Sequence, residues 1–354
     1  MKITRVEAWS VDMKLAEPYA IAYETISRAT TVFLRVETNA DISGFGCAAP
    51  DEVVTGETPD SALSALDTIV GPILKGADPL RRTRILARLR QELANHPSVR
   101  AAADMALHDI LGKAAALPLW RVLGGFRRSM PTSVTIGIVE TDEAIVKAKE
   151  LVGRGFRALK IKGGRNLTND IERILAVREA IGPRTELRFD ANQGYSVEEA
   201  LELVRATRSA RIEIFEQPTP REKPELLGRV AAGAPMAVMA DESLMSSGDA
   251  LSVARDELAD MINVKLMKVG GIDEALRIDA VASAANIEVM VGCMDESALS
   301  IAAGLHYALA RPNVAYADLD GHLDLIGDPA AGAVILHNGL LFPTGRSGLG
   351  FDLP

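Results

Sequence analysis

Three acidic residues and three lysines follow one another at regular intervals through the middle of the chain. They are Lys160, Lys162, Asp190, Glu216, Asp241 and Lys265, in the segments LKIKGG, LRFDANQ, EIFEQP, VMADES and INVKLMK. From Lys162 onward the intervals are 28, 26, 25 and 24 residues (190−162, 216−190, 241−216 and 265−241). Each residue ends a short apolar or alternating run that is typical of a strand, and a helical pattern follows it. One strand and one helix per interval predict a β/α barrel, in which the C-terminal ends of the strands meet on one face, where the active site lies.

The three acids end the third, fourth and fifth predicted barrel strands. Neighbouring strands lie about 4.8 Å apart, so Asp190, Glu216 and Asp241 are expected to reach one ion. Carboxylates that close repel one another, and a bound divalent cation removes this conflict. Oxygen ligands with room for water and substrate favour Mg²⁺ over Zn²⁺. Capping of the following helix is the alternative for each acid alone, but their occurrence on successive strands favours a Mg²⁺ site.

The lysines lie where a barrel is normally apolar. Lys160 and Lys162 share one face of their strand because side chains alternate, and a buried lysine requires a partner. Lys265 is predicted across the barrel mouth, so two bases would face each other, as proton removal from one face and delivery to the other require. A nearby cation would lower the lysine pKa toward a value useful for a base. The alternative is ion pairing without chemistry. Lys268 is expected to be a loop charge or a helix-entry residue.

The composition excludes several classes of protein. The chain has 354 residues, 48% of them hydrophobic and 25% charged, with a net charge of −9. The acidic balance argues against a nucleic-acid partner, and the longest apolar runs fall short of the roughly 18 residues of a membrane span. Two cysteines, Cys47 and Cys293, are too few for a disulfide framework. We therefore expect a protein of the reducing cytoplasm.

The order of predicted elements divides the chain into two domains. Strands at 3–11, 31–36 and 42–48 and helices at 60–74, 80–93 and 99–116 indicate an α+β domain over residues 1–124. Eight strands then alternate with helices over residues 125–330. Those strands are predicted at 133–137, 158–162, 186–190, 212–216, 237–241, 261–265, 288–293 and 314–318. A final hairpin over 333–342 is expected to pack on the first domain or the barrel rim, so that 331–354 completes the first domain.

Together these blocks resemble the muconate-lactonising subgroup of the enolase superfamily over nearly the whole chain. The resemblance is carried by MALHDILGK, PLWRVLGG and the KxK, DxNQ, ExP, ADES and NxKxxKxGG motifs in that order. It implies an α+β domain that caps a modified barrel, Mg²⁺ on the three acids, and Lys162 and Lys265 as the acid/base pair. Lys160 would hold a substrate carboxylate oxygen and depress the pKa of Lys162. In this superfamily the metal stabilises an ene-diolate formed by proton loss beside a carboxylate.

The eighth strand distinguishes among the reactions of the subgroup. These are cycloisomerisation, o-succinylbenzoate synthesis, N-acylamino acid racemisation and dipeptide epimerisation. Asp318 and Asp320, in YADLDG, are two acids that would pair with a cation, although Asp320 alone also fits a turn. The resemblance to dipeptide epimerases implies that this pair binds the ammonium of a dipeptide. It also implies that Thr135 hydrogen-bonds the dipeptide. Further lining residues are expected after the seventh strand, at Met294, Asp295 and Glu296.

Two loops of the first domain are expected to close over the substrate. They are PYAIAYETIS and APDEVVTGET. Ala-Glu epimerases carry an arginine in the first loop, whereas the matching residue here is Glu24. With Asp51, Glu52 and Asp295, it would form an acidic pocket suited to a dipeptide with a cationic or neutral second residue. The alternative is that some of these acids face solvent.

Three further expectations concern the class and assembly of the protein. A lyase or cycloisomerase would use the same metal and lysines, and a non-catalytic peptide-binding barrel is the other competing class. The protein is expected to be a homo-oligomer, as is common in the family.

Overall fold

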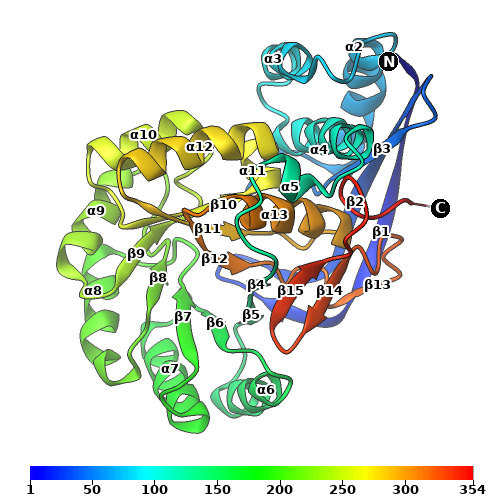
Figure 1. Ribbon diagram of the computed structural model, residues 1–354. Helices are drawn as coiled ribbons and strands as arrows, with labels where there is room; N and C mark the ends of the chain where they lie inside the picture. Colours follow the sequence, from blue (N-terminus) through cyan, green and yellow to red (C-terminus); the bar gives the residue numbers. More distant parts are fainter. Residues whose placement is uncertain (354) are drawn as a thin grey trace.

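The computed structural model describes residues 1–353 and consists of an antiparallel sheet with helices beside a parallel barrel (Figure 1). The first sheet has the strand order β13-β1-β2-β3. Its strands are β1 (Ile3–Ala20), β2 (Thr25–Thr38), β3 (Ser43–Ala48) and β13 (Leu325–Ile326). The three predicted N-terminal strands are present, but β1 and β2 are longer than predicted. Their pairing continues through a register shift after Lys14 as far as Tyr19 and Ile26, and this carries the chain toward the barrel.

The helices beside the first sheet lie where they were predicted, at 60–74, 80–93 and 99–116, and a short helix, α5, follows that was not predicted. They are α1 (Pro59–Ala65), α2 (Gly71–Leu74), α3 (Arg82–Glu92), α4 (Pro97–Ala114) and α5 (Leu119–Val122). A π-helical turn separates α1 from α2 just before Pro72, which lacks the N–H that a continuous helix would use. The buried helix α4 packs so closely on β3 that a Cβ at Gly46 would lie 2.0 Å from the Ala102 carbonyl oxygen. Glycine at this position therefore permits the close approach.

All eight predicted barrel strands are present, pair in parallel and follow chain order. They are β5 (Ser133–Ile136), β6 (Ala158–Lys162), β7 (Glu186–Asp190), β8 (Ile214–Glu216), β9 (Ala237–Ala240), β10 (Met261–Lys265), β11 (Glu288–Gly292) and β12 (Val314–Asp318). Side-chain hydrogen bonds bridge the first and last strands, where the Leu319 N–H donates to Thr132 Oγ1 at 2.9 Å. The barrel is therefore nearly closed, as predicted.

The barrel helices form an outer ring (Figure 1). They are α6 (Thr141–Gly153), α7 (Leu167–Ile181), α8 (Val197–Ala206), α9 (Pro224–Gly233), α10 (Ser247–Arg255), α11 (Leu266–Val269), α12 (Ile272–Ala284) and α13 (Ala298–Ala310). Several begin at side-chain caps, such as Ser196 with Glu199 at α8. None of the helices within residues 1–353 has the length and apolar character needed to cross a membrane.

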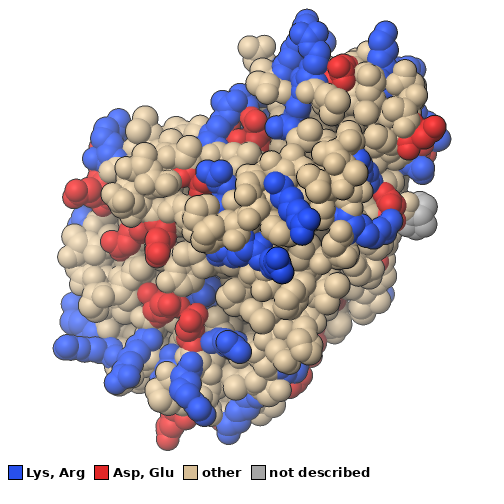
Figure 2. All heavy atoms as spheres, viewed as in Figure 1, with Lys and Arg blue, Asp and Glu red and all other residues tan. Residues whose placement is uncertain are grey.

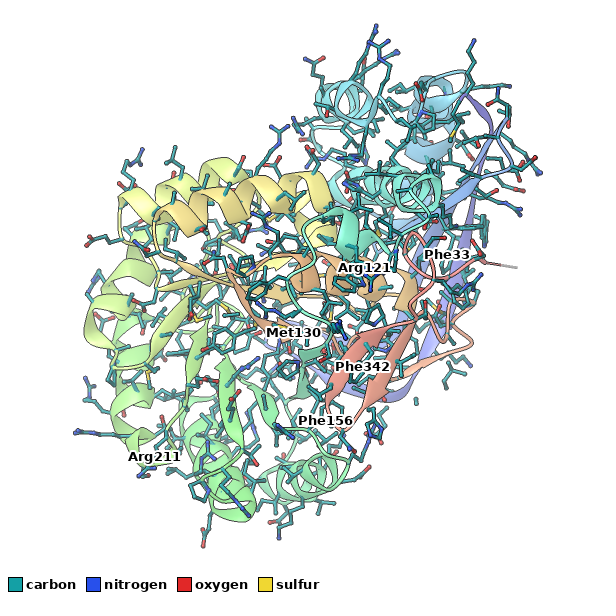
Figure 3. The ribbon with its side chains drawn as sticks, in the orientation of Figure 1. Phe33, Arg121, Met130, Phe156, Arg211 and Phe342 are labelled. Atoms are coloured by element: carbon teal, nitrogen blue, oxygen red, sulfur yellow. The ribbon has the colours of Figure 1, made fainter. Side chains whose placement is uncertain are left out.

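The C-terminal hairpin attaches to the segment just before the first barrel strand, β5. It consists of β14 (Val334–His337) and β15 (Leu340–Pro343), and β15 pairs with β4 (Met130–Pro131). Asn338 and Gly339 both have positive φ, as a two-residue hairpin turn requires. Met130 is fully buried between the hairpin and the barrel (Figure 3). The following segment returns to α4, where the Leu349 N–H donates to Asp109 Oδ1 at 2.7 Å.

Candidate active site

The three predicted acidic residues converge at the C-terminal end of the barrel. Strand register places Asp190 beside Glu216, and Asp241 directly follows β9. Their carboxylate oxygens lie within 4.8 Å of one another, and all three side chains are buried. Burial and the charge of Asp190 raise the pKa of Glu216 to about 8. The Glu216 Oε2 atom is buried without a hydrogen-bond partner. Hard oxygen donors, mutual repulsion and an unpartnered oxygen all fit a divalent cation.

The predicted lysines lie on either side of this acidic group. Lys162 Nζ lies 2.7 Å from Asp190 Oδ2, and Lys265 Nζ lies 2.8 Å from Asp241 Oδ2. Lys160 Nζ pairs with Asp318 and lies 3.7 Å from Glu216 Oε2. The structure therefore brings together residues at the ends of six barrel strands, β6 to β10 and β12.

When only the protein's own groups act, the pKa values of Lys265 and Lys160 are raised and not lowered as expected. Burial acts to lower the pKa of Lys265, but the charges of Asp241, Glu216 and Glu242 outweigh it and raise the pKa well above its usual value. The same balance raises the pKa of Lys160, chiefly through Asp318. The expectation included the charge of a bound cation, which would oppose these carboxylates.

Lys268 is not the loop charge that the sequence suggested. It is fully buried in the short helix α11, and burial lowers its pKa. Its ammonium donates to Asp241 Oδ1 at 2.6 Å and to the Asn263 carbonyl at 3.1 Å. Of the two predicted alternatives, the helix-entry residue is therefore correct and the loop charge is wrong. Helix α11 starts directly at the end of β10 and places the Lys268 ammonium against Asp241.

The acids after the eighth strand face the same cavity as the lysines. Asp318 accepts hydrogen bonds from Lys160 and from Ser133 Oγ. Although burial acts to raise the pKa of Asp318, these partners lower it to about 2. Asp320 accepts from the Thr135 N–H at 2.7 Å, and burial and Asp318 raise its pKa. One acid of the pair is thus already matched by a lysine, and the other is held by the backbone of β5.

A cavity of about 410 Å³ lies between the barrel mouth and the first sheet. Its lining includes the predicted Glu24, Asp51, Thr135, Met294, Asp295, Asp318 and Asp320, together with Lys160, Lys162, Asp241 and Lys265. Asp51 also caps its own turn, because its Oδ1 accepts from the Val54 N–H at 2.7 Å. The cavity is of the size expected for a small-molecule site. The lining residues Glu24, Asp51 and Asp295, which were predicted to determine specificity, are all acidic.

Two residues that were expected in the pocket lie outside it. Glu52 is exposed, and Glu296 is buried behind the loop that follows β11. Neither belongs to the lining found among residues 1–353. Burial raises the pKa of Glu296 to about 8. In the loop after β11, Cys293, Met294 and Asp295 line the cavity, and the chain has turned away from it by Glu296.

Sequence reasoning did not identify the residues that join the first sheet to the barrel mouth. The Tyr19 hydroxyl donates to Asp295 Oδ2 at 2.8 Å. Arg165 donates to the carbonyls of Ala22 and Glu24 at 2.9 and 3.0 Å. No motif marks these residues, since their role arises from contacts between distant segments. They fix the loop that carries Glu24 over the cavity.

Comparison with known proteins identifies the family. Residues 3–124 match the mandelate racemase/muconate lactonizing enzyme N-terminal domain, and residues 143–354 match the enolase C-terminal domain-like family. The chain belongs to the muconate-lactonising subgroup of the enolase superfamily, and it is an isomerase of the racemase and epimerase type. The predicted resemblance is thereby confirmed.

Individual relatives match over almost their full length. The L-Lys-D/L-Arg epimerase of Desulforapulum autotrophicum is 42% identical, over 99% of both chains. The substrate-liganded L-Ala-D/L-Glu epimerase of Bacillus subtilis superposes with a TM-score of 0.97 at 34% identity, covering 99% of this chain and 98% of that one. The dipeptide epimerase of Methylococcus capsulatus, complexed with Mg and L-Arg-D-Lys, gives 0.93 at 39% identity, over 99% of both chains.

Proposed function

We propose that this protein is a dipeptide epimerase, which inverts the α-carbon of the C-terminal residue of a dipeptide. The observation that carries the proposal is the Asp318–Asp320 pair in the same cavity as Lys162 and Lys265. A dipeptide has an ammonium at one end and a carboxylate at the other, and this cavity is lined both by acids that can bind an ammonium and by lysines that can bind a carboxylate. The relatives named as dipeptide epimerases support the same substrate class.

In the proposed reaction, one lysine removes the α-proton and the other returns a proton to the opposite face. Lys162 and Lys265 take these roles because they flank the acidic group from β6 and β10. Lys160 lies beside Glu216 and orients the substrate carboxylate, and Asp320 orients the ammonium. Asp190, Glu216 and Asp241 would hold Mg²⁺, which supplies positive charge that stabilises the negative charge developing on the substrate carboxylate. The cavity walls exclude water and strengthen these interactions.

We further propose that the second residue of the dipeptide is cationic. Glu24 lies at the position where the Ala-Glu epimerases have an arginine, and it lines the cavity together with Asp51 and Asp295. Burial and the charge of Asp51 raise the pKa of Glu24, and two like charges that lie close together favour a positive group between them. The Desulforapulum relative is an L-Lys-D/L-Arg epimerase, and the Methylococcus relative is complexed with L-Arg-D-Lys. Both dipeptides have a cationic second residue, which supports the same choice. A neutral second residue is the remaining alternative.

A dipeptide library tests the proposal directly. Each L,L-dipeptide is incubated in D₂O with the Mg²⁺-loaded enzyme, and epimerisation is followed by deuterium incorporation. We expect Xaa-Lys and Xaa-Arg to be turned over with the highest kcat/KM. A preference for Xaa-Glu would contradict the cationic pocket. Turnover of a muconate or succinylbenzoate precursor, with every dipeptide unchanged, would instead identify a lyase or cycloisomerase.

A further inference from the structure

A buried cluster of polar side chains lies behind the strand end that carries Lys162, outside the cavity. It consists of Asp170 and Arg173 on α7 and Tyr195 in the loop after β7. All three are nearly inaccessible, with exposures of 1%, 3% and 4%. Asp170 pairs with Arg173 and also accepts from the Tyr195 hydroxyl. None of the three lines the cavity found among residues 1–353.

The cluster holds the backbone at the ends of neighbouring barrel strands. The Arg173 guanidinium donates to the Lys162 carbonyl at 3.1 Å and to the Val139 carbonyl at 3.1 Å. Asp170 Oδ2 accepts from the Gly164 N–H at 2.8 Å. Through Tyr195, which stacks on Phe189 of β7, the cluster also reaches the loop after the next strand. The cluster therefore fixes the carbonyl of Lys162, the residue that carries the proposed base, and the N–H of Gly164 two residues later.

The loop that follows Lys162 has no space for adjustment. A Cβ at Gly163 would lie 2.3 Å from the Phe189 ring, and one at Gly164 would lie 2.0 Å from the Ala191 carbonyl oxygen. Gly164 also has φ of +95°, which favours glycine. The loop is thus packed directly against the backbone after Asp190, the acid that pairs with Lys162. A shift of this loop would move the lysine relative to that acid.

Lys265 is supported by different groups. It precedes helix α11, and its partner Asp241 is held by Lys268. Arg173 and Asp170 have no hydrogen bond to β10 or α11 among those of the described residues. Damage to the Asp170–Arg173–Tyr195 cluster should therefore affect one base and spare the other.

We infer that Asp170, Arg173 and Tyr195 are positioning residues for Lys162 and act on one half of the two-base reaction. The inference rests on the proposed function, since it requires Lys162 to exchange a proton with substrate. A buried ion pair contributes little net stability compared with apolar residues of the same size. Its geometry, in which Arg173 donates to the Lys162 and Val139 carbonyls and Asp170 accepts from the Gly164 N–H, matches a role in precise placement. An ångström of misplacement costs roughly 100-fold in rate.

The test compares solvent exchange from the two epimers, because exchange requires only the base on the face of the leaving proton. The L,L- and L,D-forms of the best dipeptide are incubated separately in D₂O with the Mg²⁺-loaded enzyme. Exchange from both forms by the unchanged enzyme establishes the proposed function independently. Lys162→Ala then identifies the epimer whose proton Lys162 removes. For Arg173→Lys, we expect exchange from that epimer to fall by roughly 10- to 100-fold, with exchange from the other within about threefold.

Arg178→Lys is the matched control. Arg178 lies on the same helix and also binds three backbone carbonyls, those of Ala210, Gly182 and Thr185, but near the start of β7. We expect it to leave both exchange rates unchanged. Tyr195→Phe keeps the ring and removes only the hydroxyl, and it should show the same asymmetry as Arg173→Lys if that variant folds poorly. An equal fall for both epimers, or no fall for either, in folded Tyr195→Phe and Arg173→Lys would overturn the inference.

Discussion

The hydroxyl of Tyr19 donates a 2.8 Å hydrogen bond to Asp295, and so joins strand β1 of the first sheet to the loop after barrel strand β11. The two residues are separated by 276 positions in the sequence. Burial raises the pKa of Asp295 to about 6, and the Tyr19 hydroxyl opposes this shift by stabilising the carboxylate. The bond therefore joins two walls of the cavity and favours the ionised form of an acid inside it.

We predict that Tyr19→Phe weakens substrate binding more than chemistry. The variant loses one hydrogen bond to a charged group, a contribution of about 1.5–3 kcal/mol, so KM should rise about tenfold while kcat changes less. Steady-state kinetics on the best dipeptide measures both constants. Tyr316→Phe is the control, because Tyr316 lies on β12 and is not part of the cavity lining within residues 1–353. A fall in kcat with unchanged KM would contradict the prediction.

Charge reversal at Glu24 should change the preferred dipeptide. Like charges placed together at a binding site cost several kcal/mol, so Glu24→Arg should lower kcat/KM for Xaa-Arg by roughly 100-fold and raise it for Xaa-Glu. Competition between the two dipeptides in one reaction measures the ratio directly. Glu52→Arg makes the same change in an exposed residue outside the cavity lining and should leave the ratio near that of the unchanged enzyme. If both variants shift the ratio equally, long-range charge and not contact determines it.

Removal of one acidic ligand should abolish tight Mg²⁺ binding. Changes even beyond the ligands typically cost 10- to 100-fold in metal affinity, so Glu216→Gln should weaken Mg²⁺ binding by at least roughly 100-fold. Calorimetric titration of Mg²⁺ into chelator-treated protein gives the affinity, and Mg²⁺ should restore epimerisation to the unchanged enzyme. Glu213→Gln is the control, because Glu213 lies just before the other end of β8. This variant should bind Mg²⁺ normally. Equal affinities for the two variants would exclude Glu216 as a ligand.

His306 should make the fold less stable at acidic pH. It is buried in α13, where its ring accepts from the Trp120 N–H at 3.0 Å and bonds the Leu349 carbonyl. Burial lowers its pKa to about 4 from 6.5. Below pH 6.5 the unfolded chain binds a proton that the folded chain excludes, so stability falls as the pH drops from 6.5 toward 4, by about 3 kcal/mol in total.

Chemical denaturation at several pH values measures this slope. His306→Asn keeps an acceptor in the side chain and should show a smaller loss of stability between pH 6.5 and 4 than the unchanged protein. His337→Asn alters an exposed histidine of the hairpin turn and should keep the original slope. The prediction fails if all three proteins lose stability in parallel.

The sequence was sufficient for the barrel because strands with a charged residue at their end recur at regular intervals, each followed by a helical pattern. Asp190 and Glu216 are examples, and their adjacency followed from strand order alone. For Lys268 the helix entry was among the predictions, but its burial against Asp241 was not, because the burial of a charge depends on where a helix points and local pattern does not show this. Tyr19 was missed for a different reason. Its partner lies 276 positions away, and the extra length of β1 that brings them together depends on pairing through a register shift.

The long strand β1 has a consequence for how such an enzyme changes its substrate. Its far end, with the adjoining loop, supplies Tyr19 and Glu24 to the cavity, whereas the lysines and the acidic group come from the barrel. The reacting groups and the Glu24 side of the selectivity pocket are thus encoded in separate stretches of the gene. Replacement of the end of β1 and the loop that follows it is therefore expected to change the preferred dipeptide and to leave the reaction itself unchanged.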